Sequence, residues 1–382
     1  MNILKKMPAD YGQLSSQLAE HIRSSADERE AERQLAPELA QQLAGSGLFN
    51  MLVPKKYSGR EVSPHEFVDT LIAGAKADGA VGWCMMIANT TGLLSASLPQ
   101  RWAEEIYGSN PEVITCGVTA PFGKLSREGD DLRVSGRWPY GSGGNISEWI
   151  SGGALLKEGD APPQQVLMFF HHSEVAFHDT WKTSGLRGTG SNDFEVKDVL
   201  VPAGRWVILG SRPKVDAPLY RFPTLGLLAL GVASVSVGIA QRAIEEFIAL
   251  ATEKTPTGSK RSLATREAVQ KDLAVAQALE ASARAYMHAT IEEAWQIAER
   301  GEKMPRAQKA ALRLAASNAA WQSAKAVDLL YHAAGGTAIY SESVLQRCFR
   351  DVHVTTQHIM VAQPTFEMLG KLPLQLDNNA ML

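Results

Sequence analysis

The residues best suited to carry chemistry are a histidine near the C-terminus and a serine in a glycine-rich segment. His358 stands eight residues after Arg350. Near neutral pH an imidazole exchanges protons with a phenol or a ring nitrogen, although a histidine within a helix more often has a structural role. Ser142 lies within 136–144, where glycines would let backbone amides approach a planar cofactor while one small hydroxyl faces its reactive edge. Seen alone, such a segment is more often an ordinary glycine-rich loop between two strands.

The composition is that of an ordinary globular protein. Of 382 residues, 45% are hydrophobic and 21% are charged, and the formal net charge of −3 argues against nucleic-acid binding. Cys84, Cys116 and Cys348 lack the spacing of a disulfide framework or a zinc site, so we predict no metal and a reducing compartment. No signal peptide is evident, and the longest apolar stretch, 225–240, is shorter than the ~20 residues that span a bilayer. We therefore expect a cytoplasmic protein that does not bind a membrane.

The hydrophobic pattern divides the chain into three parts. Apolar residues recur every three to four positions from 11 to 46, and a second helical region starts at Ser63-Pro64. Short runs rich in β-formers follow at 113–118, 132–135, 149–156, 166–170, 175–178 and 194–201. Long helical segments are predicted near 225–253, 264–300, 305–334 and 341–369. We predict an α+β protein with a helical domain (1–110), an antiparallel β-domain (111–218) and a four-helix bundle (219–382).

This domain order resembles the acyl-CoA dehydrogenase family over nearly the whole chain. Gly335-Gly336-Thr337 is similar to the paired-glycine turn that approaches the flavin in that family. The segment that starts at Arg350-Asp351 is similar to the one that carries the catalytic glutamate at its far end. Here Gln357-His358-Ile359-Met360 stands where that glutamate would fall. A histidine in this place resembles the branch of the family that hydroxylates aromatic substrates with reduced flavin and oxygen.

The resemblance implies a set of flavin contacts. The segment that includes Trp138 and Ser142 is similar to the flavin-contacting strand of the monooxygenases, in which a serine bonds flavin N5 and prolongs a C4a-hydroperoxide. Trp181 and Thr183 belong to a loop similar to one that packs on the flavin, although Trp181 is as compatible with a core position. The further cofactor contacts that we predict are Thr119, the basic pair Lys260-Arg261, and Gly335 with Gly336.

The same resemblance implies substrate contacts and partners. Besides His358, the pocket walls are predicted on one helix, at Trp83, Met86, Asn89 and Leu93, where packing in the core is an equally good interpretation. The chain has no visible nicotinamide-binding unit, so a separate NAD(P)H-dependent reductase would supply FADH2 or FMNH2. We thus predict the oxygenase component of a two-component monooxygenase, acting on an aromatic or heteroaromatic molecule with O2, and a homotetramer.

Two other functions are compatible with the sequence but are disfavoured. One is a dehydrogenase or oxidase acting on an acyl-CoA or a small acyl compound. It is disfavoured because 220–225 also lacks the acid that some dehydrogenases carry there, and because 254–261 replaces their pyrophosphate-anchoring arginine motif. The other is a scaffold protein without activity, which the presence of both Ser142 and His358 disfavours.

Overall fold

The computed structural model describes residues 14–376, and the first part of it is helical as expected. Ser63 caps α4 by accepting a hydrogen bond from the backbone N–H of Glu66, and Pro64 occupies the first turn. Asp78 caps α5 in the same way, through the N–H of Val81. The helices are α1 (Ser16–Ser24), α2 (Ala26–Glu32), α3 (Pro37–Gly45), α4 (Pro64–Ala77), α5 (Gly79–Gly92) and α6 (Gln100–Ala103), with short turns η2 (Lys55–Tyr57), η3 (Leu93–Ala96) and η4 (Glu104–Gly108).

The middle part is one seven-stranded sheet with the order β5-β6-β2-β1-β3-β4-β7. Its strands are β1 (Thr115–Glu128), β2 (Asp131–Gly141), β3 (Trp149–Leu156), β4 (Gln164–His171), β5 (Ala176–His178), β6 (Asn192–Val201) and β7 (Trp206–Ile208), interrupted by the turns η5 (Gly144–Ile146), η6 (His172–Glu174) and η7 (Arg187–Thr189). The short strand β7 was not predicted.

The prediction of a purely antiparallel sheet was wrong, because β1 and β3 run parallel. β2 first folds back beside β1 as a hairpin. The segment 142–148 then crosses to the other side of β1, so β3 sets out again in the direction of β1. This crossing carries Ser142 to the end of the sheet where β1 begins.

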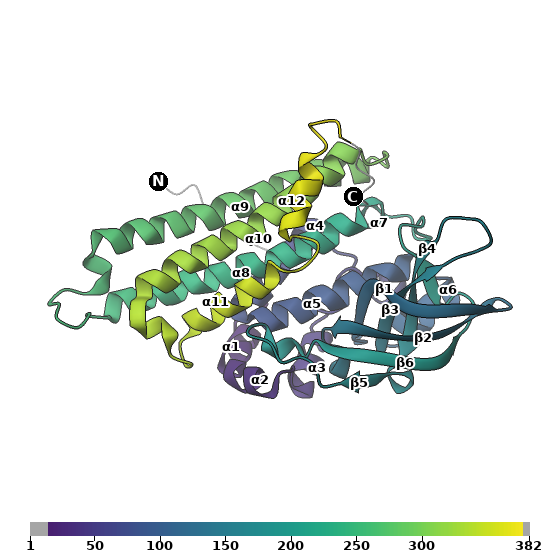
Figure 1. Ribbon diagram of the computed structural model, residues 1–382, viewed down its shortest axis with the longest axis horizontal. Helices are drawn as coiled ribbons and strands as arrows, with labels where there is room; N and C mark the ends of the chain where they lie inside the picture. The colour runs from purple at the N-terminus through teal and green to yellow at the C-terminus, as the bar shows by residue number, and fades with distance from the viewer. Residues whose placement is uncertain (1–13, 377–382) are drawn as a thin grey trace.

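The C-terminal part is a helical bundle made of α7 (Pro218–Arg221), α8 (Thr224–Glu253), η8 (Leu263–Thr265), α9 (Glu267–Glu299), α10 (Arg306–Ala334), η9 (Gly335–Ile339), α11 (Val344–Thr355) and α12 (Gln363–Gly370). Three helices match the prediction closely (Figure 1). The fourth was expected as one helix over 341–369, but it is broken between α11 and α12 by a turn at 356–362. His358 therefore lies in a turn and not within a helix.

Helix α8 is longer than the apolar stretch seen in the sequence. It has 30 residues and, among the described residues, is the one helix long and apolar enough to cross a membrane by length and composition. Its most apolar window is 78% buried inside the protein, as in the core helix of a bundle.

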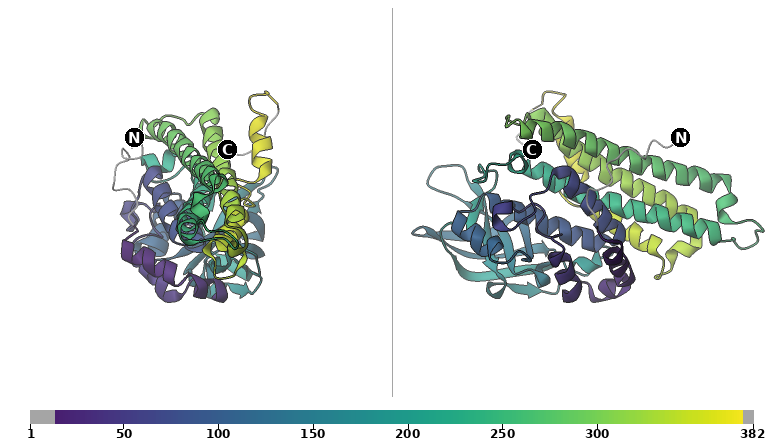
Figure 2. Two further views of the ribbon diagram at one scale, coloured as in Figure 1. Left: turned by 90° about the vertical axis from the view of Figure 1, so that its left-hand side faces the viewer. Right: turned by 180° about the vertical axis from the view of Figure 1, so that it is seen from behind.

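Small residues let α8 join the bundle to the N-terminal helices. A Cβ added at Gly238 would lie 2.5 Å from the backbone oxygen of Ile72 on α4, and one added at Gly231 would lie 2.6 Å from Met86 on α5. The sheet packs beside α5 on the other side, below the bundle (Figures 1 and 2). The three parts of the chain thus meet around α5.

Candidate active site

A cavity of about 420 Å³ lies where the three parts meet. Its walls come from α5 and η3 (Trp83, Ile87, Thr90, Thr91, Leu93, Leu94), the sheet and its loops (Gly117, Val118, Thr119, Ala120, Phe122, Tyr140, Ser142, Ser151, Leu167, Trp181, Leu186, Ser191, Leu209), α8 (Thr224, Leu225, Leu228) and the end of α11 with its turn (Val354, Gln357, His358, Ile359). Of the described residues that line it, none is Asp, Glu, Lys or Arg. The cavity is therefore mostly apolar and holds no carboxylate that could act as a base.

Trp83 connects the serine and the histidine singled out in the sequence. Its indole Nε1 donates a hydrogen bond to Ser142 Oγ at 3.0 Å. Its ring meets the His358 ring edge-on, with the centroids 5.6 Å apart. Two residues 216 positions apart in the chain are thus held on one wall by a single tryptophan.

Ser142 is held firmly in the crossing between β2 and β3. Only 4% of its surface is exposed. Tyr140, two residues before it, has φ of +68°, which is uncommon for a residue with a side chain and tends to occur at functional sites. The carbonyl of Tyr140 accepts the N–H of Ser142 at 2.8 Å. This bent backbone directs the serine at the cavity, and it leaves Tyr140 at the mouth, beside Trp181.

His358 is held as a neutral imidazole. The backbone N–H of Met360 donates to Nδ1 at 3.3 Å, so Nδ1 carries no proton and Nε2 carries it. Burial, and after it the guanidinium of Arg313, lower the pKa of His358 to about 4. Arg313 is 5% exposed, and its Nη2 donates to the carbonyl of Met360 at 3.3 Å. The turn therefore presents a hydrogen-bond donor, the Nε2–H group, at neutral pH.

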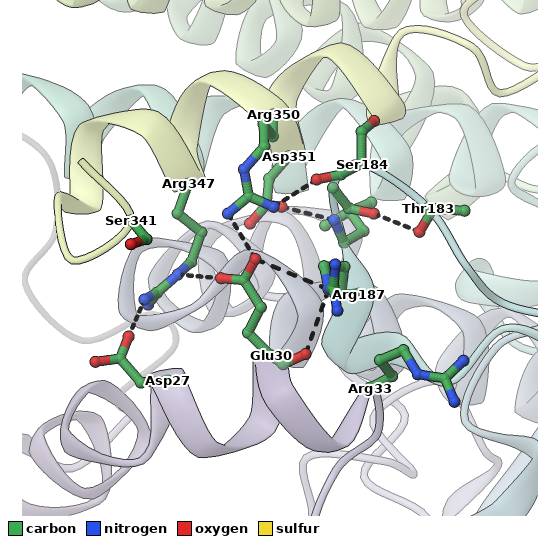
Figure 3. A network of polar contacts seen from close by, with 12 residues as sticks. Asp27, Glu30, Arg33, Thr183, Ser184, Arg187, Ser341, Arg347, Arg350 and Asp351 are labelled. Atoms are coloured by element: carbon green, nitrogen blue, oxygen red, sulfur yellow. Dashed lines mark hydrogen bonds and ion pairs between the residues drawn. The ribbon is translucent and has the colours of Figure 1, made fainter. Parts of the chain in front are cut away.

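The turn that carries His358 is bonded to the bundle, and the helix before it, α11, is bonded to α2. Trp321 Nε1 donates to the carbonyl of Val361 at 3.0 Å. On the side of α11, Glu30 lies between Arg347 and Arg350, with N–O distances of 2.9 and 2.5 Å (Figure 3). Arg350 and Asp351 thus hold α11 in place through separate partners and do not pair with each other.

Asp351 ties α11 to the loop that closes the cavity. Its Oδ1 accepts the N–H of Leu186 at 2.6 Å, and Arg350 donates to the carbonyl of Ser184 (Figure 3). Burial raises the pKa of Asp351 to about 7. Leu186 lines the cavity with a positive φ of +48°. The strained backbone of this wall is therefore held by a side chain from the helix that precedes His358.

The predicted cofactor contacts fall into two groups. Thr119, Ser142 and Trp181 line the cavity, as expected if a flavin binds there. Thr183 does not line it, because its hydroxyl donates to the carbonyl of Gly185. Trp138 has no exposed surface, and its Nε1 bonds the carbonyl of Gly153 inside the sheet, so its side chain cannot contact a ligand.

The paired glycines and the basic pair lie at the far end of the bundle. Lys254 Nζ donates to the carbonyl of Ala334, which places the loop with Lys260 and Arg261 beside Gly335 and Gly336. These residues are exposed, and a Cβ added at either glycine would meet no atom within 4 Å. Along α8, Glu253 at this end lies about 38 Å from Leu228, the last residue of the helix that lines the cavity. The structure thus brings these four residues together, but not with their own chain's cavity.

The predicted substrate walls are partly at the cavity. Trp83, Leu93 and His358 line it. Met86 packs against Gly231, and Asn89 donates from Nδ2 to two backbone carbonyls, so both belong to the core. The sequence pattern of α5 did not separate these residues, because this helix is buried on nearly all sides.

Several lining residues were not singled out from the sequence. The α8 residues Thr224, Leu225 and Leu228 come close only through the fold. Ser191 lies in the same loop between β5 and β6 as Trp181 and Thr183, and no role was predicted for it. A run of small hydroxyl residues beside glycines, as in Thr189-Gly190-Ser191, is the signal that could have found it.

The cavity fits the flavin that the sequence resemblance implies. Ser151 Oγ lines the cavity, is 1% exposed as a residue, and has no hydrogen-bond partner. A Cβ at Gly117 would lie 3.0 Å from both the Ser151 Cβ and the Thr91 Oγ1, so this floor stays open only with glycine. Exposed aromatic rings, Phe122 and Tyr140, border the same space. A planar polar ring is a suitable occupant of such a cavity.

Comparisons with known proteins identify the family. Residues 13–100 match the acyl-CoA dehydrogenase N-terminal domain, and residues 230–363 match the acyl-CoA dehydrogenase C-terminal domain. The chain is 31% identical over 350 residues to an indole-3-acetate monooxygenase of Pseudomonas putida, covering 92% of this chain and 90% of that protein. It is 27% identical to the flavin-dependent monooxygenase oxygenase subunit HsaA of Mycobacterium tuberculosis, over 89% of each chain.

A solved structure agrees in fold. XiaF from a Streptomyces species, in complex with FADH2 and glycerol, superposes with a TM-score of 0.89 at 23% identity, over 96% of this chain and 95% of that one. The predicted fold class and the predicted enzyme class are both confirmed, and the predicted use of reduced flavin is confirmed with them. The chain belongs to the acyl-CoA dehydrogenase family, in its branch of reduced-flavin-dependent monooxygenases.

Proposed function

We propose that this chain hydroxylates an aromatic or heteroaromatic small molecule, as the oxygenase component of a two-component system. The observation that carries this proposal is the contact of one tryptophan, Trp83, with both Ser142 and His358 on the wall of an uncharged cavity. A mostly apolar cavity of this size suits a small aromatic ring with few polar groups. The relatives named above, an indole-3-acetate monooxygenase and an oxygenase subunit, support the same assignment.

The residues of this chain have separate tasks in that reaction. Reduced flavin, when bound, supplies the electrons and the ring on which oxygen is activated. Ser142 Oγ would hold the N5 edge of that ring, and Trp83 holds the serine. His358 donates its Nε2–H to an oxygen or nitrogen of the substrate and orients the ring. The apolar walls from α5 and α8 exclude water from the space between them.

The rival function, oxidation of an acyl-CoA or a small acyl compound, needs a base that removes a carbon-bound proton. Of the described residues that line the cavity, none is a carboxylate, and the one imidazole already holds its proton at the nitrogen that faces away from Met360. The two functions therefore differ in what they need from His358: the rival function needs a base, whereas His358 is a hydrogen-bond donor.

Oxygen uptake tests the proposal directly. The protein is mixed with chemically reduced FAD or FMN and oxygen, in the presence of a panel of indoles, phenols and acyl-CoA thioesters. We expect hydroxylated product from at least one ring compound. Conversion of an acyl-CoA to its enoyl product, with no ring compound hydroxylated, would contradict it.

We also propose a cytoplasmic homotetramer that receives FADH2 or FMNH2 from a separate NAD(P)H-dependent reductase. The support for assembly is the exposed end of the bundle, where Gly335, Gly336, Lys260 and Arg261 gather away from their own chain's cavity. Three buried, unpaired cysteines favour a reducing compartment. Light scattering that shows a monomer at micromolar concentration would contradict the tetramer.

A further inference from the structure

A row of three hydroxyl groups ends at the cavity. Thr189 Oγ1 lies 2.6 Å from Ser191 Oγ, and Ser191 Oγ lies 2.7 Å from Ser142 Oγ. All three residues are buried. At the cavity end, Trp83 Nε1 donates to Ser142 Oγ at 3.0 Å. The direction in which the protons point along this row decides what Ser142 can offer to a ligand.

The direction follows from counting hydrogens, because each hydroxyl has one hydrogen and two lone pairs. Thr189 Oγ1 donates its hydrogen to the carbonyl of Leu186 at 2.8 Å. The hydrogen between Thr189 and Ser191 must therefore come from Ser191, and the hydrogen between Ser191 and Ser142 must come from Ser142. The indole N–H of Trp83 occupies one lone pair of Ser142. One lone pair of Ser142 is left for a ligand, and no hydrogen.

The start of the row is fixed. A carbonyl accepts hydrogen bonds and cannot donate, so the row cannot reverse while Thr189 stays bonded to Leu186. The carbonyl of Leu186 also accepts Trp181 Nε1 at 3.0 Å, and its N–H is held by Asp351 of α11 at 2.6 Å (Figure 3). Leu186, whose carbonyl sets the direction of the protons, is therefore held by hydrogen bonds at both its backbone carbonyl and its backbone N–H.

We propose that Thr189 and Ser191 are specificity-determining residues, which make Ser142 a hydrogen-bond acceptor and so select the reduced flavin over the oxidised flavin. The inference rests on the proposed function, in which Ser142 meets flavin N5. Reduced flavin carries a hydrogen on N5 and can donate it to the free lone pair. Oxidised flavin presents a lone pair at N5, which would face the lone pair of Ser142 without a hydrogen between them. One buried hydrogen bond lost in this way corresponds to about ten- to a hundredfold in affinity.

Flavin binding by the whole apo-protein tests this proposal without turnover. The Kd for oxidised FAD is measured by fluorescence, and the Kd for dithionite-reduced FAD is measured anaerobically; both are repeated with FMN. For the native protein we expect the reduced form to bind about ten- to a hundredfold more tightly. In Ser191→Ala the hydrogen of Ser142 is released and can turn to the cavity. The serine can then donate to oxidised N5 or accept from reduced N5, so the ratio of the two Kd values should fall toward one.

A second variant and a matched control complete the design. Thr189→Val keeps the shape, removes the anchor of the row and should lower the same ratio. Thr183→Val is the control, since its hydroxyl also donates to a backbone carbonyl of this loop but does not line the cavity; the ratio should stay at the native value. Circular dichroism and melting temperature show which variants fold. If Ser191→Ala does not fold, Thr189→Val tests the inference in its place.

Three outcomes would count against the inference. If both variants weaken the two flavin forms equally, the row is only structural and the proposed direction is wrong, while the flavin site stands. If the native protein binds the two forms equally, Ser142 does not discriminate between them. If the native protein binds neither form of FAD or FMN, the proposed function itself fails.

Discussion

Acid should leave the hydroxylation activity nearly unchanged until the pH is well below 6, because His358 stays neutral. Its pKa lies at about 4, through burial first and the nearby Arg313 second. At pH 5.5 an imidazole with the ordinary pKa of 6.5 is about 90% protonated, whereas one with a pKa of 4 is about 3% protonated. If the neutral Nε2–H form is the active one, the two cases differ about tenfold in rate at that pH.

Substitution of Arg313 tests the cause of the shift. Arg313→Gln removes the buried cation but not the burial, so the pKa of His358 should rise above 4 and stay below 6.5. The pH at which activity falls on the acid side should rise by the same amount. Arg313→Lys keeps the cation and should leave that pH near its native value.

A pKa of His358 below 6.5 also affects stability. The folded state then binds fewer protons than the unfolded state between about pH 4 and 6.5, so the stability from this group is lost as the pH falls through that window.

Two measurements check this prediction independently. Hydrogen–deuterium exchange at the histidine C2 position, followed by mass spectrometry, gives the pKa of each histidine in the apo-protein. Product formed per reduced flavin, measured from pH 5 to 8 with chemically reduced flavin, gives the activity profile. A native half-loss of activity near pH 6.5, or a His358 pKa that does not change in Arg313→Gln, would refute the reasoning.

His358→Ala should lower hydroxylation by about 10²–10⁴, with oxygen still consumed and released as hydrogen peroxide. His353→Ala is the control, because the imidazole of His353 pairs with an aspartate at 2.8 Å outside the cavity. Equal product from the two variants would remove His358 from the mechanism. Burial raises the pKa of Asp351 to about 7, so the folded state keeps the proton of this carboxyl up to that pH. The native protein should therefore lose stability relative to Asp351→Asn as the pH rises from about 4 to 7. Melting temperatures of the two proteins that change in parallel with pH would contradict this. Gly238→Ala would place a Cβ 2.5 Å from a backbone oxygen of α4 and should cost about 1–3 kcal/mol in denaturant unfolding, whereas Gly336→Ala, with no atom within 4 Å, should cost less than 1 kcal/mol.

Local patterns in the sequence were sufficient for most of the fold. The Ser63-Pro64 pair predicted the start of α4, and apolar periodicity predicted the three long bundle helices nearly to their ends. These signals are local, because a cap or an amphipathic face depends on residues within a few positions. The break before α12 was missed, because apolar residues continue through 359–361 and the turn is fixed by contacts from distant Arg313 and Trp321.

The pairing of β1 with β3 was missed for a similar reason. A strand's composition indicates that it is a strand, but its neighbour is decided by where the connecting segment goes. The crossing at 142–148 carries the chain around β1, and no residue type in it specifies a side. This crossing is also what delivers Ser142 to the cavity.

The sequence alone predicted Ser142 and His358 as the chemical groups, and it has no glutamate at the position where the family carries its base. Only the tertiary structure decided that Trp83 bonds the serine and contacts the histidine, and that Met360 fixes the tautomer of His358. It also decided which residues of α5 reach the cavity, and that Trp138 does not. The physical reason is that residue type sets what a group can donate or accept, whereas burial and the partners brought by distant segments set what it does.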